Sequence, residues 1–263
     1  MKKMLLAAML ACMPTVAPAQ GDSEPLCTDR PSKSNNVCTV PEGHIQIESD
    51  IGNWTRTDDH GTREDVILYT SPTMKLGVGP ATDVQVTISP YVETHTRDAS
   101  SVSRVGGFGD TYLRVKQRFT PKDATFQIGA IPFVKVPTAG RDVGNGAWEG
   151  GVSVPIQYGL PDGFSLGSSP EIDVIEDADG RGRHVQFVTT ANVGRTLGTR
   201  TSVGVELWTA QDFDPESTGR QYSADVFATW LATTMVQLDA GANFGLNRQT
   251  PDVQVYFGVS TRF

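Results

Sequence analysis

Two histidines have acidic neighbours that would suit them to act as a catalytic base. His95 is followed by Asp98, and His60 is preceded by Asp58 and Asp59. A histidine oriented by a carboxylate can activate a serine nucleophile. No nucleophile elbow and no H-E-x-x-H segment accompanies these pairs. We therefore predict no catalytic residues, and a membrane-embedded lipid hydrolase is the least favoured function.

Two short motifs could bind a phosphate or a metal ion. GGFG at 106–109 is not followed by a helix or by Gly-Lys-Ser/Thr, so we interpret its glycines as a tight re-entry of the chain into the fold. EDADG at 176–180 is similar to half of a calcium loop but lacks the downstream glutamate in register. We expect no specific metal site and no cofactor.

A basic ladder is the strongest chemical feature of the chain. Arg114, Lys116 and Arg118 alternate along one face of a predicted strand, and Lys135 lies in the next strand. Opposed basic and acidic walls would create a transverse field that orients polar solutes in a pore. The slightly favoured alternative is that these charges pair internally and hold the fold together. The acidic candidates for the same inner face are Glu93, Glu149 and Glu206.

The elements that must position these charges are strands. From His44 onward, apolar and polar residues alternate with a period of two, which is typical of half-buried β-strands. In the last segment Val253, Val255, Phe257, Val259, Thr261 and Phe263 form one face. We predict an all-β fold, a transmembrane antiparallel up-and-down β-barrel over 44–263 with about 12 strands. The strands are expected near 44–56, 64–78, 83–95, 110–119, 124–136, 148–159, 164–175, 184–195, 200–210, 221–231, 235–245 and 252–263.

The connections between the predicted strands support a barrel. Long polar connections, such as 137–147, alternate with tight turns, and outer-membrane barrels have this asymmetry. Pro72 lies in the middle of 64–78 and predicts a bulge or a division into two shorter strands. A terminal strand that ends on Phe263 resembles the signal read by the barrel-assembly machinery.

The N-terminus predicts export. Lys2 and Lys3 precede a short apolar stretch, and Ala17-Pro18-Ala19 offers a cleavage site, so 1–19 is predicted to be a signal peptide. A lipoprotein acylated at Cys12 is disfavoured because the residues before this cysteine form a poor lipobox. The net charge of −8 argues against a nucleic-acid partner.

Two cysteines remain in the predicted periplasmic N-terminal segment, 20–43. An oxidising periplasm favours a disulfide between Cys27 and Cys38. The alternative is a pair of metal ligands, but no second Cys or His pair lies near enough in the sequence to complete a tetrahedral site.

Four stretches carry a family resemblance. CTDRPSKSNNVCTVPEGHIQIESD at 27–50, GFGDTYLRVK at 107–116, PFVKVPTAG at 132–140 and VGNGAWEGGVSVP at 143–155 resemble the outer-membrane transporters of the phenol-degradation meta-pathway family. The resemblance implies an outer-membrane barrel with a transport role for small organic or aromatic solutes, and it implies no catalytic residues.

Three functions follow from these patterns. The first is uptake of small solutes through a polar lumen, with Arg114, Lys116, Arg118, Lys135, Glu149, Glu93 and Glu206 along the solute path. The second is a plugged structural or adhesive barrel whose acidic outer loops carry the interactions. The third is the lipid hydrolase. The expected partners are outer-membrane lipid and lipopolysaccharide, the assembly machinery through Phe263, and a small-molecule solute.

Overall fold

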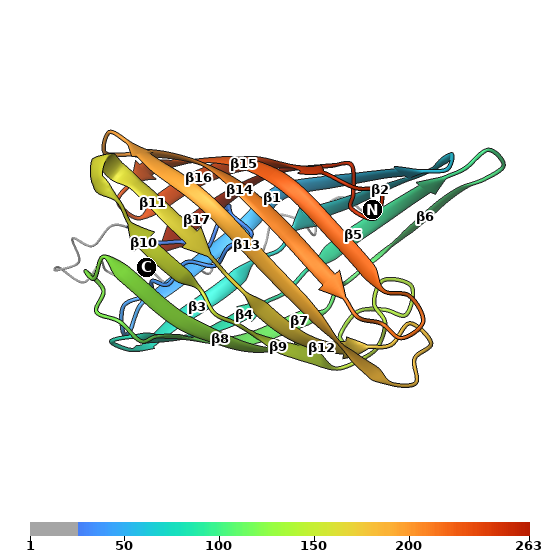
Figure 1. The fold of residues 1–263 in the computed structure, drawn as a ribbon, viewed down its shortest axis with the longest axis horizontal. Coiled ribbons are helices and arrows are strands. Elements are labelled where there is room, and N and C mark those ends of the chain that lie inside the picture. The colour runs from blue at the N-terminus through green and yellow to red at the C-terminus, as the bar shows by residue number, and fades with distance from the viewer. Residues whose placement is uncertain (1–25) are drawn as a thin grey trace, which may run out of the picture.

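The chain folds into a closed β-barrel. The computed structural model describes residues 26–263, so the predicted signal peptide and Cys12 lie outside the described residues. One antiparallel sheet closes where the last strand, β17, pairs with the first, β1 (Figure 1). The barrel has 12 strands, as the alternating pattern predicted. Within the described part of the chain, no helix has the length and hydropathy needed to cross a bilayer.

Seven of the barrel strands are single elements and five are divided into two. The single strands are β1 (Ile45–Asp59), β8 (Phe126–Val136), β13 (Arg183–Leu197), β14 (Thr201–Asp212), β15 (Gly219–Thr233), β16 (Val236–Gly245) and β17 (Val253–Arg262). The divided strands are β2 (Thr62–Thr70) with β3 (Thr73–Gly79), β4 (Thr82–Thr87) with β5 (Tyr91–Arg97), β6 (Val102–Gly107) with β7 (Thr111–Arg118), β9 (Glu149–Ser153) with β10 (Ile156–Gly159), and β11 (Phe164–Ser168) with β12 (Glu171–Glu176). A single 3-10 turn, η1 (Pro161–Gly163), connects β10 to β11.

Prolines account for four of the five divisions. Pro72, Pro90, Pro155 and Pro170 each fall between the two halves of a strand, and each lacks the backbone N–H that a strand interior requires. Their carbonyls can still accept, and Pro72 O accepts from the N–H of Ile88 at 3.1 Å. The predicted division at Pro72 is confirmed. The division at Pro90, inside the predicted strand 83–95, was missed.

The fourth barrel strand starts earlier than predicted. Residues 102–107, expected in a long loop, form β6 and pair with β5. Gly106 suits this strand because a Cβ there would lie 2.7 Å from the hydroxyl of Tyr91. Gly109, in the gap between β6 and β7, would likewise place a Cβ 2.8 Å from the Cβ of Ser89. The GGFG glycines therefore permit close packing across the β5–β6 hairpin and at its base.

The two ends of the barrel differ. We call the end that carries the connections 137–148, 177–182, 213–218 and 246–252 the loop end, and the opposite end, where the C-terminus lies, the turn end (Figure 1). The β1–β2 and β5–β6 hairpins extend beyond the rest of the loop end (Figure 1). The first connection is much shorter than predicted. Only His60 and Gly61 separate β1 from β2, and both have positive φ, as a tight hairpin turn requires.

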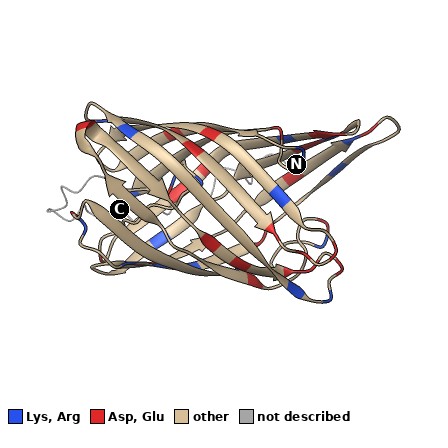
Figure 2. Cartoon of the chain, viewed as in Figure 1, with Lys and Arg blue, Asp and Glu red and all other residues tan. Residues whose placement is uncertain are grey.

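The barrel wall has an apolar outside and a charged inside. Exposed positions of the strands are apolar, such as Ile172, Val205 and Leu207. Lys and Arg, Asp and Glu occur along the whole length of the barrel (Figure 2), and the strand charges Lys75, Glu206 and Asp225 are buried. A closed sheet in lipid satisfies its backbone internally and places polar side chains in its lumen.

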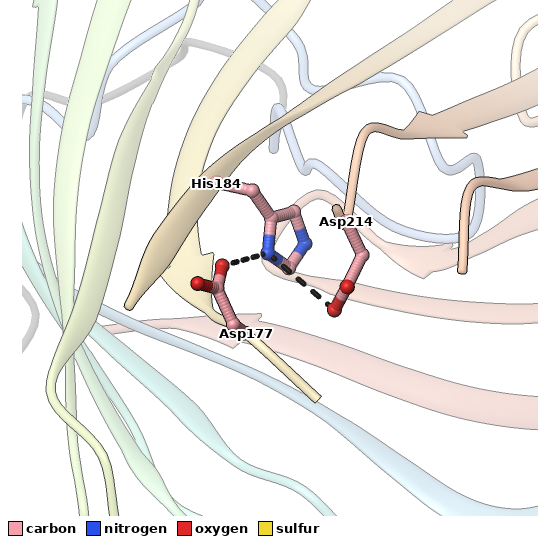
Figure 3. A group of neighbouring side chains, drawn as sticks. All are labelled: Asp177, His184 and Asp214. Atoms are coloured by element: carbon pink, nitrogen blue, oxygen red, sulfur yellow. Dashed lines mark hydrogen bonds and ion pairs between the residues drawn. The ribbon is translucent and has the colours of Figure 1, made fainter. Parts of the chain in front are cut away.

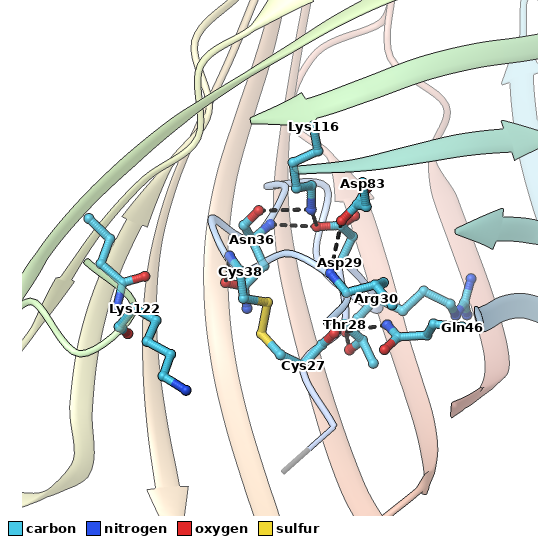
Figure 4. The surroundings of a disulfide bond; sticks show 12 residues. Cys27, Thr28, Asp29, Arg30, Asn36, Cys38, Gln46, Asp83, Lys116 and Lys122 are labelled. Carbon is cyan, nitrogen blue, oxygen red and sulfur yellow. Dashed lines mark hydrogen bonds and ion pairs between the residues drawn. A yellow bond between two sulfur atoms is a disulfide. The ribbon is translucent and has the colours of Figure 1, made fainter. Parts of the chain in front are cut away.

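Residues 26–44, ahead of β1, enter the lumen. The segment contains no helix or strand, and Figure 4 shows it surrounded by barrel strands. Val37 is fully buried and Val40 nearly so. The backbone N–H of Val40 donates to Asp83 at 3.0 Å. The predicted Cys27–Cys38 disulfide is present and closes a loop within this segment, which we call the lumen loop, residues 27–38.

Candidate functional site

The predicted lumen residues lie on the inner face of the barrel but separate into different environments. Lys116 and Glu206 contact the lumen loop. Arg114, Lys135 and Glu149 line one cavity. The remaining two, Arg118 and Glu93, lie toward opposite ends of the barrel. The basic ladder is therefore not one continuous wall of the solute path.

Lys116 pairs with the lumen loop rather than with a neighbouring strand. Its Nζ lies 2.5 Å from Oδ1 of Asp29 and donates to the carbonyl of Asn36 at 2.9 Å (Figure 4). Lys75 of β3 contacts the other oxygen of Asp29 at 2.5 Å and also contacts Glu48. Burial raises the pKa of Asp29, but Lys116 and Lys75 outweigh it, so this pKa falls well below its usual range. Asp29 is therefore a carboxylate fixed between two buried ammonium groups.

Basic residues of the lumen loop match acidic residues of the opposite wall. Arg30 contacts Asp50 of β1 and Asp239 of β16, both at 2.8 Å. Lys33 lies 3.2 Å from Asp225 of β15, and its Nζ is 4.4 Å from the centre of the Trp208 ring. The guanidinium of Arg30 is held by charged hydrogen bonds, which are stronger than neutral ones. The lumen loop is thus bound to walls on both sides.

Glu206 also binds the lumen loop. Its carboxylate accepts from the hydroxyl of Ser32 at 2.6 Å and from the backbone N–H groups of Lys33 and Ser34 at 2.9 and 3.1 Å. The side-chain hydroxyl of Ser34 also forms a hydrogen bond with the hydroxyl of Thr190 in β13. Glu206 therefore positions the loop, and its carboxylate is not presented to open lumen.

A cavity of about 510 Å³ lies between the lumen loop and the loop end. Arg114 projects from β7 into it, donates to Thr87 at 2.6 Å, and lies over the rings of Tyr112 and Phe133 at 5.0 and 6.0 Å. Asp173 of β12 lines the same cavity, and its Oδ1 makes no hydrogen bond. The cavity therefore presents a cation and aromatic faces to whatever enters it, and acidic residues (Glu149, Glu171 and Asp173) are part of its lining.

Lys135 and Glu149 close this cavity toward the loop end. Their side chains form an ion pair at 2.6 Å. Lys135 also donates to Asn145 at 2.6 Å, and Asn145 donates to Glu149 at 2.7 Å. Asn145 belongs to the connection 137–148, one of the long polar connections expected from the sequence. This connection is tied to the inner wall through Asn145.

A second cavity, about 850 Å³, lies at the turn end. The residues that line it include Arg118 and two residues of the lumen loop, Cys27 and Cys38. Two other residues of the lumen loop, Lys33 and Asn35, line the cavity of Arg114. Arg118 donates to the carbonyls of Thr120 and Pro80 at 2.6 and 3.0 Å. The lumen loop therefore lies between the two cavities.

The histidine pairs considered for catalysis are not assembled as a site. His95 contacts Glu93 instead of Asp98, and Arg104 contacts the same glutamate. Asp98 accepts from the backbone N–H groups of Ser100 and Ser101 in the β5–β6 turn.

The other predicted pair does form, but at an exposed hairpin tip. His60 lies 2.6 Å from Asp59, and both side chains are exposed. The G-x-S-x-G pattern of a nucleophile elbow does occur in the sequence, as GFSLG at 163–167, and the sequence prediction overlooked it. Ser165, however, lies within β11 rather than at a strand-to-helix turn. A strand interior does not present the serine as a nucleophile elbow does.

Sequence reasoning missed the residues that fill the lumen. Asp29, Arg30 and Lys33 were treated as part of a periplasmic segment, although each pairs with the barrel wall. A signal was available in the strands, because β1, β14, β15 and β16 carry inward acidic residues with few inward basic ones. Those carboxylates need cations, and the lumen loop supplies two of them.

Comparison with solved structures supports the fold. The outer membrane channel from Pseudomonas putida F1 has a TM-score of 0.69 and 14% identity, over 87% of this chain and 98% of that one. The β domain of a Bordetella autotransporter, Brka, has a TM-score of 0.53 and 10% identity, over 84% and 100%. The NanC porin has a TM-score of 0.51 and 10% identity, over 82% and 98%. At these identities the likeness shows a shared barrel fold. No curated protein sequence matched the chain.

The family comparison covers the whole barrel and all of the lumen loop except Cys27. The model of the family described as "Putative MetA-pathway of phenol degradation" matches residues 28–263. The match includes the stretches at 107–116, 132–140 and 143–155 in full and the stretch at 27–50 from residue 28 onward. A closed barrel with an apolar outer face and a charged lumen is the form of an outer-membrane protein. The chain belongs to the outer-membrane β-barrel family described as "Putative MetA-pathway of phenol degradation".

Proposed function

We propose that this barrel is a channel through which small organic solutes cross the outer membrane. The observation that carries the proposal is the cavity at Arg114, which lies inside the barrel next to the loop end. Its guanidinium and the rings of Tyr112 and Phe133 suit a solute with an aromatic ring and a polar group. The family's description, which names phenol degradation, supports this solute class. The Pseudomonas putida structure, which is described as an outer membrane channel, supports the channel but names no solute.

The lumen loop is the barrier in the proposed path. It lies between the cavity of Arg114 and the cavity at the turn end, so a solute that crosses the barrel must pass it. The loop is held by ion pairs and hydrogen bonds, not by a continuous strand, and such contacts can break without opening the barrel. We propose that displacement of the lumen loop opens the channel.

A plugged structural or adhesive barrel is the second candidate. The observation in its favour is the number of ion pairs that bind the lumen loop to the wall. Asp29 pairs with Lys75 and Lys116. Arg30 pairs with Asp50 and Asp239. If the lumen loop never leaves the lumen, the barrel stays closed and its outer loops carry the interactions of the protein.

Single-channel conductance of the refolded protein in a planar bilayer separates these candidates. Discrete steps in the wild type, or steps that appear only in a Lys116→Ala variant, support a channel. Silence in both proteins, with barrel folding verified by heat-modifiable gel migration, supports the structural barrel. An Arg118→Ala variant is the matched control, because Arg118 binds turn carbonyls and not the lumen loop.

Two partners are proposed for the barrel in the outer membrane, the assembly machinery and lipopolysaccharide. The backbone of Phe263 pairs with Ile45, and its side chain is exposed at the turn end. We propose that the assembly machinery reads this residue and that lipopolysaccharide surrounds the loop end.

We also propose that the protein is not an enzyme. Unchanged lipid turnover in a His60→Ala/His95→Ala variant would agree with this.

A further inference from the structure

Three side chains, two from neighbouring connections and one from the strand β13, converge at the loop end. Asp177 follows β12, His184 is near the start of β13, and Asp214 follows β14. Nδ1 of His184 lies 2.8 Å from Oδ1 of Asp177 and 3.7 Å from Oδ2 of Asp214 (Figure 3). One potential ligand atom from each residue lies within 4.8 Å of the other two.

The histidine is buried and its second nitrogen is not satisfied. His184 is only 8% exposed, and its Nε2 makes no hydrogen bond. Oδ1 of Asp212 is 2.8 Å from Nε2 but lies off the direction in which a ring N–H would donate. Three carboxylates thus surround one imidazole, and a bound cation would offset this concentration of negative charge.

The two aspartates are held in place by the backbone. Asp214 accepts from the N–H groups of Ala178 and Glu216, both at 2.7 Å. The turn at 177–182 is closed by a hydrogen bond between Asp177 N–H and Gly182 O at 3.1 Å. A Cβ at Gly182 would lie 2.0 Å from Oδ2 of Asp177, so only glycine leaves room for this carboxylate. The ligand atoms are therefore positioned before any ion arrives.

We propose that Asp177, His184 and Asp214 form a binding site for a divalent transition-metal ion such as Zn²⁺. One imidazole nitrogen and two carboxylate oxygens are a ligand set that suits Zn²⁺ and leaves a position for water. Ligands about 2.1 Å from a tetrahedral ion are about 3.4 Å apart. The distances from Nδ1 to the two carboxylate oxygens, 2.8 and 3.7 Å, lie on either side of this value. Binding would displace the proton shared by Nδ1 and Asp177 and leave a proton on Nε2, which the carboxylate of Asp212, 2.8 Å away, would stabilise through its charge.

The site would fasten two connections at the mouth of the barrel. It joins 177–182 to 213–218, and β13 and β14 pair beneath them through Gln186 and Asp212. The calcium loop considered at 176–180 lacked a glutamate from the same segment. The proposed site instead takes His184 and Asp214 from elsewhere in the chain, and it does not depend on whether the barrel conducts.

Calorimetric titration of the chelator-treated, folded barrel with Zn²⁺ tests the proposal. We expect one Zn²⁺ per chain, with affinity reduced at least about 100-fold in His184→Gln and about 10- to 100-fold in Asp212→Asn. A His95→Ala variant is the matched control, because His95 contacts one carboxylate, Glu93, at another hairpin and should bind Zn²⁺ as the wild type does. Ca²⁺ should bind far more weakly, since it prefers oxygen ligands.

Several outcomes would overturn the proposal. These are no Zn²⁺ binding by the wild type, equal binding by His184→Gln, or a loss of binding in His95→Ala as large as that in His184→Gln. Co²⁺ offers a second readout, because visible absorption bands from a coordinated imidazole should appear in the wild type. If His184→Gln does not fold, an Asp214→Asn variant takes its place, since Asn keeps an oxygen for the N–H of Ala178.

Discussion

Nζ of Lys116, in the middle of β7, lies 2.5 Å from Oδ1 of Asp29, in the segment that precedes the first strand of the barrel. This pair joins the wall to the lumen loop. Lys116 is 1% exposed, so the ammonium has exchanged water for Asp29 and the carbonyl of Asn36. A buried charge that loses its partner is costly, and the contact therefore opposes release of the loop.

Removal of the Lys116 ammonium should loosen the lumen loop. A Lys116→Met variant keeps most of the side-chain volume but leaves Asp29 with Lys75 alone. Loss of one partner of a buried pair costs about 3–5 kcal/mol, so we expect larger or more frequent conductance steps than in the wild type. Conductance in a planar bilayer measures this, and identical traces would show that the pair does not hold the loop.

The same pair predicts a pH dependence. Burial raises the pKa of Asp29, yet Lys116 and Lys75 lower it further, so it lies below its ordinary value of 3.8. A carboxyl whose pKa is lower in the folded state stabilises that state fully above its unfolded pKa, and this contribution is lost as the pH falls through the folded value. The loop should therefore stay bound at pH 7 and at pH 5 and weaken only below about pH 4.

An Asp29→Asn variant separates this carboxylate from the other acidic groups of the lumen. It should show at pH 7 the loosened loop that the wild type shows only in strong acid. Conductance recorded from pH 7 down to pH 3 for both proteins checks the prediction. A wild-type change centred near pH 6 would point to a histidine and contradict the assignment to Asp29.

The disulfide should restrain the lumen loop from within. Cys27 and Cys38 are 11 positions apart in the sequence and close a small loop between the two cavities. A cross-link over a loop of about this length contributes roughly 3 kcal/mol by limiting the alternatives open to the chain. We expect a Cys27→Ser/Cys38→Ser variant to keep the barrel, judged by heat-modifiable migration, and to give noisier conductance. Protease digestion should also cleave 27–38 faster in this variant, and equal cleavage rates would oppose the prediction.

The barrel itself was predictable because lipid and lumen impose a strict period of two. The final strand is an example, since Phe257 is exposed while Tyr256 and Ser260 are buried, as alternation required. β6 was missed because Val102 and Arg104 are both exposed in a hairpin beyond the rest of the loop end. A strand that need not cover one apolar face carries no alternating pattern.

The contents of the lumen were not predictable from local pattern. Residues 27–38 have no periodicity, and their structure depends on partners such as Asp239 and Glu206 that are distant in sequence. The alternation placed Arg114 and Lys116 on one face, and both do point inward. Alternation could not show that Lys116 is paired with Asp29 while Arg114 lies in a cavity, because the segment that makes the difference lies outside the strands.

Arg114 should set the charge preference of the channel. Its guanidinium lines the cavity, donates to Thr87 and lies over the rings of Tyr112 and Phe133. The carboxylates of Asp29 and Glu171 are near enough to act on it through charge, and Arg114 is the cation that opposes them in this part of the lumen. A cation beside the path raises the local concentration of anions. An Arg114→Ala variant should shift the selectivity toward cations, by about 2- to 10-fold in the anion-to-cation permeability ratio at low salt, and less at high salt because of screening. Reversal potentials under a salt gradient measure this ratio.

A Lys135→Ala variant is a useful comparison. Because Lys135 is already paired with Glu149, its removal should free a carboxylate and favour cations at least as strongly. If the Arg114 variant keeps the wild-type ratio while conducting, the permeating ions bypass this cavity and the solute path must run along another part of the wall.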